Sequence, residues 1–285
     1  MAIPNTHIYD TGHTPNWCPG CGDFGIWSAL KRALIDLKWS PAEVMMVYGV
    51  GCHGHMVNFL KSYGFEGLHG RSLPVAQGIK LANKNLNVIV VAGDGDTFGE
   101  GTNHLSHAAR RNHDITMILH DNQVYGLTTG QTAPTAKRGF KTKSTPYGVL
   151  EEAVNPTALA LAFGATFVAR SFAGDIEQTA SIIAAAARHK GFAFVDVFQP
   201  CVTFNHVNTY QWYREHIFKL DDSYTPHDKI EAFKLSYDTE RLATGIFYTE
   251  ERDIYEQDVP QTKEMPLVDL PVNHDVLPHL IDDFR

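Results

Sequence analysis

The chain has 285 residues, of which 44% are hydrophobic, and a formal net charge of −8. A chain of this length can bury a full core as one domain with a short appendage. The acidic balance argues against nucleic-acid binding, which needs an excess of lysine and arginine. The sequence has neither a long uninterrupted apolar stretch nor a signal-peptide pattern at its start. We therefore expect a cytoplasmic protein that contacts no membrane and binds small molecules or other proteins.

Five apolar runs predict buried strands, and the stretches between them suit helices. The runs are 43–49, 87–92, 115–120, 165–170 and 192–198. A helix is predicted over 175–190, where an alanine-rich stretch ends before Gly191, a residue that often follows a helix. Strands that alternate with helices indicate an α/β fold with a parallel sheet flanked by helices.

The sequence changes character at Asp221. From there to the end, 16 acidic residues stand against 6 basic ones, a net charge of −10, whereas the preceding part sums to +2. Several prolines and apolar residues such as Ile254 still occur there, so disorder is not the expected state. We expect one domain over 1–208 and, over 209–285, an extended C-terminal arm that contacts another subunit.

Two polar motifs follow consecutive predicted strands. Gly93–Asp96 reads Gly-Asp-Gly-Asp, and Asp121–Asn122 follows the next strand. Parallel strands deliver their C-terminal ends to one edge of a sheet, so these motifs should meet there. Glycines let the backbone approach a phosphate, and the oxygens of Asp94, Asn122 and the Val124 carbonyl suit Mg2+. Either motif alone is an ordinary turn, but the pair favours a site for a diphosphate and its metal.

The motif pair resembles the signature of thiamine-diphosphate enzymes, in which Gly-Asp-Gly is followed by Asn. Here 26 residues separate Gly95 from Asn122. The resemblance implies that Asp94, Asn122 and Val124 hold Mg2+. It also implies a set of residues around thiamine diphosphate: Val50, Gly51, Cys52, His53, His69, Gly70, Gly95, Asp96, Gly126 and Leu127.

Four cysteines are expected near the same edge. Cys18 and Cys21 form a Cys-x-x-Cys pair, and Cys52 and Cys201 each follow a predicted strand. Four thiolates suit either structural zinc or an iron–sulfur cluster, and buried inert cysteines are the third possibility. A cofactor that forms an electron-rich intermediate needs an electron acceptor, and zinc has no redox chemistry, so the cluster is favoured.

With the cysteines, the resemblance narrows to the β subunits of 2-oxoacid:ferredoxin oxidoreductases, over about residues 14–208. The stretches that match are Cys-Pro-Gly-Cys-Gly at 18–22, Cys52 after the first core strand, and Gln-Pro-Cys at 199–201. The resemblance implies a thiamine-diphosphate-binding fold and a 4Fe-4S cluster held by Cys18, Cys21, Cys52 and Cys201. It implies oxidative decarboxylation of a 2-oxoacid, pyruvate or 2-oxoglutarate, to acyl-coenzyme A and carbon dioxide, with electrons passed to ferredoxin.

The resemblance also implies a partner chain. Thiamine enzymes bind the cofactor across two domains, and the second domain supplies a glutamate that activates the aminopyrimidine. Too little sequence follows Cys201 for such a domain. We therefore expect an α subunit, activity only in its presence, and a heterodimer or a dimer of heterodimers.

One position departs from the commonest family pattern. After the third cysteine many members have small residues followed by Lys or Arg, whereas this chain reads Cys52-His-Gly-His55-Met56. We hypothesise that His55 contacts the substrate, with a structural or cluster-flanking role as the alternative. Two other functions remain open for the chain: a non-oxidative thiamine-dependent decarboxylase subunit, and a zinc-stabilised binding module without catalysis.

Overall fold

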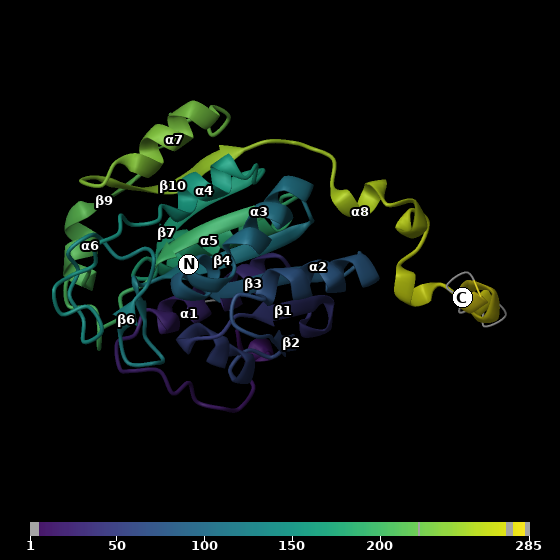
Figure 1. Cartoon of the computed structure of the whole chain (residues 1–285), viewed down its shortest axis with the longest axis horizontal. Coiled ribbons are helices and arrows are strands. Elements are labelled where there is room, and N and C mark those ends of the chain that lie inside the picture. The colour runs from purple at the N-terminus through teal and green to yellow at the C-terminus, as the bar shows by residue number, and fades with distance from the viewer. Residues whose placement is uncertain (1–5, 222, 272–275, 283–285) are drawn as a thin grey trace.

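The computed structural model describes residues 6–221, 223–271 and 276–282. Its centre is an eight-stranded sheet with the order β2-β1-β3-β4-β8-β7-β10-β9. Helices α1 and α5 pack on one face, and α2, α3, α4 and α7 pack on the other (Figure 1). A sheet covered on both faces explains why its central strands are continuous apolar runs.

The five predicted strands are confirmed, each to within two residues, and they form the middle of the sheet. Neighbouring strands run parallel, and β10 runs antiparallel to β7. A separate two-stranded sheet pairs β5 with β6. The strands are β1 Val44–Tyr48, β2 Tyr63–Glu66, β3 Asn87–Gly93, β4 Ile115–Asp121, β5 Val124–Tyr125, β6 Gln131–Thr132, β7 Phe167–Phe172, β8 Ala193–Phe198, β9 Ile217–Lys219 and β10 Leu242–Thr249.

The predicted helix over 175–190 is also confirmed, as α5. Its N-terminus is capped by Asp175, whose side chain accepts a hydrogen bond from the Gln178 N–H at 3.1 Å. No helix in the described part of the chain is both long and apolar enough to cross a membrane. The helices are α1 Asp23–Asp36, α2 Ser72–Ala82, α3 Thr102–Arg111, α4 Pro156–Ala162, α5 Ile176–Arg188, α6 Tyr210–His216, α7 Lys229–Tyr237, α8 Tyr255–Asp258 and α9 Leu277–Asp282.

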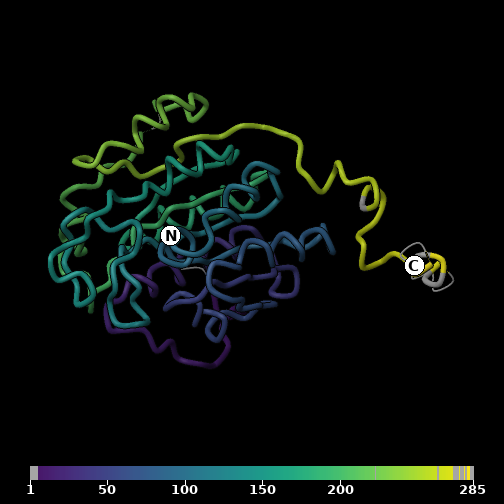
Figure 2. The backbone as a smooth tube through the Cα atoms, viewed as in Figure 1, coloured from purple at the N-terminus to yellow at the C-terminus, as the bar shows by residue number. Residues whose placement is uncertain are grey.

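The C-terminal part divides at Thr249. Before it, α6, β9, α7 and β10 belong to the body of the molecule, and β10 extends the sheet beside β7. The expectation of an arm over 209–285 did not foresee these elements. After Thr249 the chain turns away from the sheet and continues through α8 along the edge of the body, where Lys84 donates to the carbonyl of Lys263 (Figures 1 and 2). We call residues 250–271 and 276–282 the C-terminal arm.

Buried polar contacts fix the start of the C-terminal arm to the body. Glu256 is 1% exposed, and its Oε1 lies 2.5 Å from Nδ1 of His113. Its Oε2 accepts a hydrogen bond from the Asp114 N–H at 3.2 Å. The Asn112 side chain donates to the carbonyl of Arg252 at 3.1 Å. The arm therefore begins at a defined point on the body, between α3 and β4.

A buried ion pair lies between β7 and β8. Arg170 Nε donates to Asp196 Oδ2 at 3.0 Å, and Arg170 Nη2 donates to the Thr157 hydroxyl at 2.8 Å. Burial raises the pKa of the nearby Asp121 well above its usual range, and the negative charges of Asp196 and Asp94 raise it further. Arg170 is the cation that balances this group of acids.

Replacing Arg170 with Met should therefore destabilise the chain strongly. The change leaves Asp196 buried without its cation, a loss that costs about 3–5 kcal/mol. Urea unfolding followed by circular dichroism measures the free energy of unfolding. The matched control is Arg110→Met, because Arg110 is exposed at the end of α3, and its change should stay within about 0.5 kcal/mol. Equal stability of the two variants would contradict the role given to Arg170.

Candidate functional site

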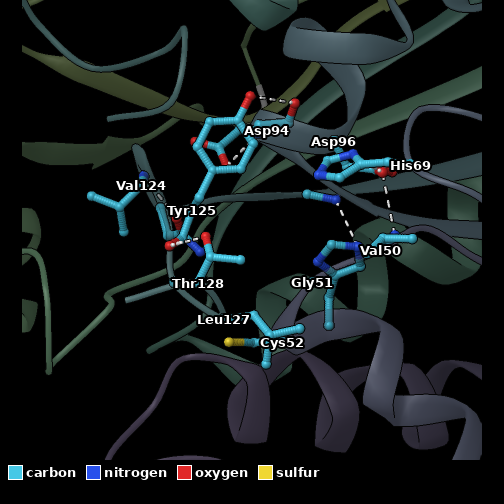
Figure 3. Close-up of a pocket in the computed structure, with 15 residues that line it drawn as sticks. Val50, Gly51, Cys52, His69, Asp94, Asp96, Val124, Tyr125, Leu127 and Thr128 are labelled. Carbon is cyan, nitrogen blue, oxygen red and sulfur yellow. Dashed lines mark hydrogen bonds and ion pairs between the residues drawn. The ribbon is translucent and has the colours of Figure 1, made fainter. Parts of the chain in front are cut away.

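The C-terminal ends of β1, β3 and β4 border one pocket, which we call the strand-end pocket (Figure 3). Every residue predicted to surround the diphosphate, the metal or the rest of the cofactor lines it, apart from Gly70. Its lining residues are Val50, Gly51, Cys52, His53, His69, Gly93, Asp94, Gly95, Asp96, Asn122, Val124, Tyr125, Gly126, Leu127 and Thr128. The sheet topology thus brings the two predicted motifs together.

Asp94 follows β3 and is 1% exposed. Its Oδ2 accepts hydrogen bonds from the Gln123 N–H at 2.7 Å and from the Thr135 hydroxyl at 2.5 Å. Its Oδ1 accepts from the Gly95 N–H at 2.9 Å. Burial raises the pKa of Asp94 to about 6, although these hydrogen bonds oppose the shift. The carboxylate is therefore held in one position in the pocket wall.

Asn122 follows β4 and is held by three hydrogen bonds. Its Oδ1 accepts from the Val124 N–H at 2.9 Å, and its Nδ2 donates to Gln199 Oε1 at 2.9 Å. Its carbonyl accepts from the Asn205 side chain at 3.1 Å. These contacts fix the orientation of the side-chain amide, so its oxygen and nitrogen have distinct surroundings.

Asp96 joins three segments of the pocket wall. Its Oδ1 accepts hydrogen bonds from the Gly70 N–H at 2.8 Å and the Val50 N–H at 3.2 Å. Nδ1 of His69 lies 2.8 Å from the same oxygen. Gly70, predicted to touch the cofactor, contacts this carboxylate and is not among the residues that line the strand-end pocket, so its contact with the cofactor stays a prediction. Asp96 therefore positions the loops after β1 and β2.

His53 acts as a buried neutral acceptor. Its Nε2 accepts a hydrogen bond from the Gly93 N–H at 3.0 Å, and burial lowers the pKa of His53 to about 3. The ring fills the space beside two glycines. A Cβ at Gly51 or at Gly93 would lie 2.7 Å from His53 Cε1. Glycine is therefore required at both positions for this packing.

The four cysteines line a second cavity of about 230 Å³, which we call the thiol cavity. A Cβ at Gly126 would lie 3.5 Å from the Cys52 sulfur and 3.7 Å from the Cys201 sulfur. In the described part of the chain, no three His, Cys, Asp or Glu side chains converge on a position for one metal ion. The two cavities share a wall, which consists of Cys52, Asn122, Gly126 and Leu127.

The thiols of Cys21, Cys52 and Cys201 lie in a low-dielectric environment that opposes their ionisation. Burial raises the pKa of Cys52 to about 12, and it also raises the pKa of Cys21 and of Cys201. The Asp23 carboxylate raises the pKa of Cys21 further, because the Cys21 thiol donates to Asp23 Oδ2 at 3.3 Å. Thiolates at these positions would need a compensating positive charge such as that of iron or zinc.

His55 lines the thiol cavity and is not among the residues that line the strand-end pocket. It is half-buried, and its Nδ1 lies 3.5 Å from Asn16 Oδ1. Its contact with a substrate stays a prediction.

Sequence reasoning missed three residues that organise the site. Gln199 accepts a hydrogen bond from the Asn122 side chain, and the Thr135 hydroxyl donates one to Asp94. His120 at the end of β4 is fully buried, and its Nδ1 lies 2.7 Å from Asp23 Oδ1. Gln199 alone carried a signal, because it precedes Cys201 in the Gln-Pro-Cys turn.

Comparison with known proteins identifies the class first. The family model "Thiamine pyrophosphate enzyme, C-terminal TPP binding domain" matches residues 49–197. The family model for the C-terminal part of the pyruvate ferredoxin oxidoreductase beta subunit matches residues 201–264. The fold is thus that of the thiamine-diphosphate-binding enzymes.

Individual relatives narrow the class. The chain is 42% identical to 2-oxoacid:ferredoxin oxidoreductase 1, subunit beta, of Aeropyrum pernix, over 95% of this chain and 89% of that protein. It is 44% identical to the corresponding beta subunit of Saccharolobus solfataricus, over 92% of this chain and 90% of that protein.

A solved structure agrees with these relatives. 2-Oxoglutarate:ferredoxin oxidoreductase from Magnetococcus marinus, with 2-oxoglutarate, coenzyme A and succinyl-CoA bound, matches with a TM-score of 0.90 and 34% identity, over 99% of this chain and 96% of that chain. The chain belongs to the β subunits of the 2-oxoacid:ferredoxin oxidoreductases, as its sequence resemblance predicted. This membership favours an oxidoreductase subunit over both alternative functions.

Proposed function

We propose that the chain binds thiamine diphosphate and Mg2+ in the strand-end pocket and a 4Fe-4S cluster in the thiol cavity. With an α subunit it decarboxylates a 2-oxoacid oxidatively, transfers the acyl group to coenzyme A and passes the electrons to ferredoxin. The observation that carries the proposal is the shared wall, because a cluster in the thiol cavity would lie directly beside a cofactor in the strand-end pocket.

The strand-end pocket fits a magnesium diphosphate. Asp94, Asn122 and Val124 line the pocket, and the Asp94 carboxylate, the Asn122 amide oxygen and the Val124 carbonyl would be its metal donors, all hard oxygen ligands of the kind that Mg2+ prefers. When bound, thiamine diphosphate supplies the carbon nucleophile and the electron sink for decarboxylation. Asp94 and Asn122 would hold its diphosphate through the metal, and Asp96 would hold the surrounding loops in place.

The thiol cavity fits a group of several atoms. Cys18, Cys21, Cys52 and Cys201 are among the residues that line a cavity of about 230 Å³. This space favours a 4Fe-4S cluster over a single zinc ion, whose four ligands converge on one point. The iron would supply the positive charge that the buried thiolates need. All four cysteines are free, which suits a reducing compartment and supports a cytoplasmic location.

The relatives support a partner subunit and a class of substrate. Beta subunits are named as one part of a larger enzyme, and we propose an α subunit that completes the cofactor site in a heterodimer or a dimer of heterodimers. The structural neighbour with 2-oxoglutarate and coenzyme A supports 2-oxoglutarate as a substrate, with pyruvate as the other candidate. The C-terminal arm, which follows β10 in the chain, is the proposed contact with another subunit (Figure 1).

The test is an anaerobic preparation of this chain with its α partner. Iron and zinc are assayed, and the visible spectrum is followed while 2-oxoglutarate or pyruvate is added with coenzyme A. We expect a brown protein with about four irons per chain, bleached by one of the two substrates. A colourless zinc protein would support the binding module instead. Carbon dioxide release without bleaching would support the non-oxidative decarboxylase.

The substrate role of His55 has its own test. If His55 binds the carboxylate of the 2-oxoacid, His55→Ala should raise the Michaelis constant about tenfold or more, because a hydrogen bond to a charged group is lost. The turnover number should change much less. His13→Ala is the control, since His13 is an exposed histidine. Unchanged Michaelis constants for every 2-oxoacid would remove His55 from the substrate site and leave it a structural role.

Metal binding should weaken in acid. With a pKa of about 6, Asp94 is a carboxylate above this pH and a neutral acid below it. A proton and a metal compete for the same oxygens, so affinity should fall roughly tenfold per pH unit below 6. Mn2+ can replace Mg2+, and its binding can be followed by electron paramagnetic resonance on both sides of pH 6. A constant affinity across this range would contradict a direct role for Asp94.

A further inference from the structure

One side-chain amide links the strand-end pocket to the thiol cavity. Gln199 follows β8 and is 2% exposed. Its Oε1 accepts a hydrogen bond from Asn122 Nδ2 at 2.9 Å, and its Nε2 donates to the Cys21 sulfur at 3.4 Å. The proposed metal ligand and the proposed cluster ligand are therefore two hydrogen bonds apart.

The surroundings of Gln199 leave it little freedom. Its backbone N–H donates to the Asp121 carbonyl at 2.8 Å, and the Gly22 N–H donates to the carbonyl of Pro200 at 3.1 Å. Gly22 packs directly against the Gln199 side chain, because a Cβ at Gly22 would lie 2.6 Å from Gln199 Cγ. The segment before α1 thus holds the amide between the two cavities.

Gln199 determines which end of the Asn122 amide is the oxygen. Asn122 Oδ1 accepts from the Val124 N–H, and Asn122 Nδ2 donates to Gln199. A flipped Asn122 would bring its nitrogen against the Val124 N–H and its oxygen against Gln199 Oε1, so both hydrogen bonds would become repulsive contacts. Gln199 therefore keeps the Asn122 oxygen in the position where a metal can use it.

At its other end, the same amide acts on a sulfur. An N–H donor to a ligating thiolate stabilises the more negative, reduced state of a cluster and so raises its reduction potential. Hydrogen bonds in series also polarise one another. A metal on Asn122 Oδ1 draws electrons from that amide, strengthens its Nδ2–H as a donor to Gln199, and so strengthens the Gln199 Nε2–H as a donor to Cys21.

We propose that Gln199 is a positioning residue that couples the two sites, so that Mg2+–thiamine diphosphate raises the reduction potential of the cluster. The coupling rests on the proposed function, because it requires both groups to be bound. By thermodynamic linkage, the reduced cluster then binds Mg2+–thiamine diphosphate more tightly than the oxidised cluster does. Gln199 thus makes electron acceptance responsive to cofactor occupancy.

Two substitutions distinguish the hydrogen bond of Gln199 to Asn122 from its hydrogen bond to Cys21. Gln199→Met has a similar length but neither donates nor accepts a conventional hydrogen bond. Gln199→Glu still accepts from Asn122, but its carboxylate cannot donate to Cys21. Gln211→Met is the matched control, because Gln211 is exposed on α6 and its side chain bonds to Glu215.

The experiment uses the anaerobic holoenzyme with its α subunit. Iron content and Mg2+–thiamine diphosphate binding are measured first. The midpoint potential of the cluster is then determined by redox titration with electron paramagnetic resonance, with and without Mg2+–thiamine diphosphate and without 2-oxoacid. We expect the cofactor to raise the potential in the wild type and in Gln211→Met. Gln199→Met should lose this difference, and Gln199→Glu should have a lower potential in both conditions.

The outcomes distinguish the coupling from the proposed function. A wild type without iron or without cofactor binding would overturn the proposed function and the coupling together. If the wild type contains iron and binds the cofactor but has the same cluster midpoint potential with and without the cofactor, only the coupling is overturned. The coupling is also overturned if the Gln199→Met variant shows the same cofactor-dependent change in midpoint potential as the wild type. If Gln199→Met does not fold, Gln199→Glu is the test. A midpoint potential in Gln199→Glu equal to that of the wild type refutes the coupling through Gln199.

Discussion

Asp94→Asn should abolish the binding of Mg2+–thiamine diphosphate at working concentrations and, with it, all turnover. The substitution removes the negative charge of the proposed magnesium site. It also places an amide nitrogen where Oδ1 or Oδ2 now accepts hydrogen bonds from main-chain N–H groups, those of Gly95 and Gln123. The loss of even an outer partner of a metal ligand can cost about 100-fold in affinity, and the loss of a ligand should cost at least as much.

Calorimetric titration of the complex with the α subunit measures this affinity directly. Asp258→Asn is the control, since Asp258 is an exposed acid in α8. Iron content should be the same in both variants, which separates a cofactor defect from a general folding defect. Wild-type affinity in Asp94→Asn would place the metal elsewhere.

Cys52→Ser should produce the opposite pattern, with cofactor bound and electron transfer lost. Cys52 is the cysteine that lines both cavities. Serine keeps the size of the wall but is a much poorer iron ligand than a thiolate, so the 4Fe-4S cluster should be lost or incomplete. Reduction of ferredoxin should fall to the background rate, while Mg2+–thiamine diphosphate still binds, with a changed affinity because Cys52 also lines the strand-end pocket.

Iron assay, electron paramagnetic resonance and cofactor titration test this prediction together. The chain has only four cysteines, so no spare cysteine can serve as a control. Val202→Thr takes that place, because Val202 lines the thiol cavity without a sulfur and is 37% exposed. Full iron content and normal ferredoxin reduction in Cys52→Ser would mean that the thiol cavity holds no cluster ligated by Cys52.

The central sheet could be predicted from sequence because its strands are covered on both faces. β3, β4 and β8 are mostly apolar and are buried along nearly their whole length, so periodicity was not needed to find them. The edge strand β2 was missed because all four of its residues are exposed. β9 and β10 were missed because they lie in or beside an acidic segment that was interpreted as a separate arm, whereas tertiary pairing with β7 places β10 in the sheet.

The candidate site was predicted where residue type alone indicates chemistry. Gly-Asp-Gly, the later Asn and the four cysteines are short patterns with few other uses in this arrangement. The supporting side chains carried no such signal, because Thr135 and His120 act through distances that only folding creates. The position of His55 was also not predictable from residue type. Residue type identified the nearby Cys52 as a candidate ligand, but it could not show that His55 lines the thiol cavity.

The wall shared by the two cavities has a consequence for genetic interpretation. Cys52, Asn122, Gly126 and Leu127 each serve two sites, so one substitution there alters two binding equilibria at once. Substitutions in contact with a common group are generally not additive. Epistasis between substitutions in the strand-end pocket and substitutions in the thiol cavity should therefore be concentrated at these four positions. A substitution there that strengthens binding in one cavity will usually change binding in the other.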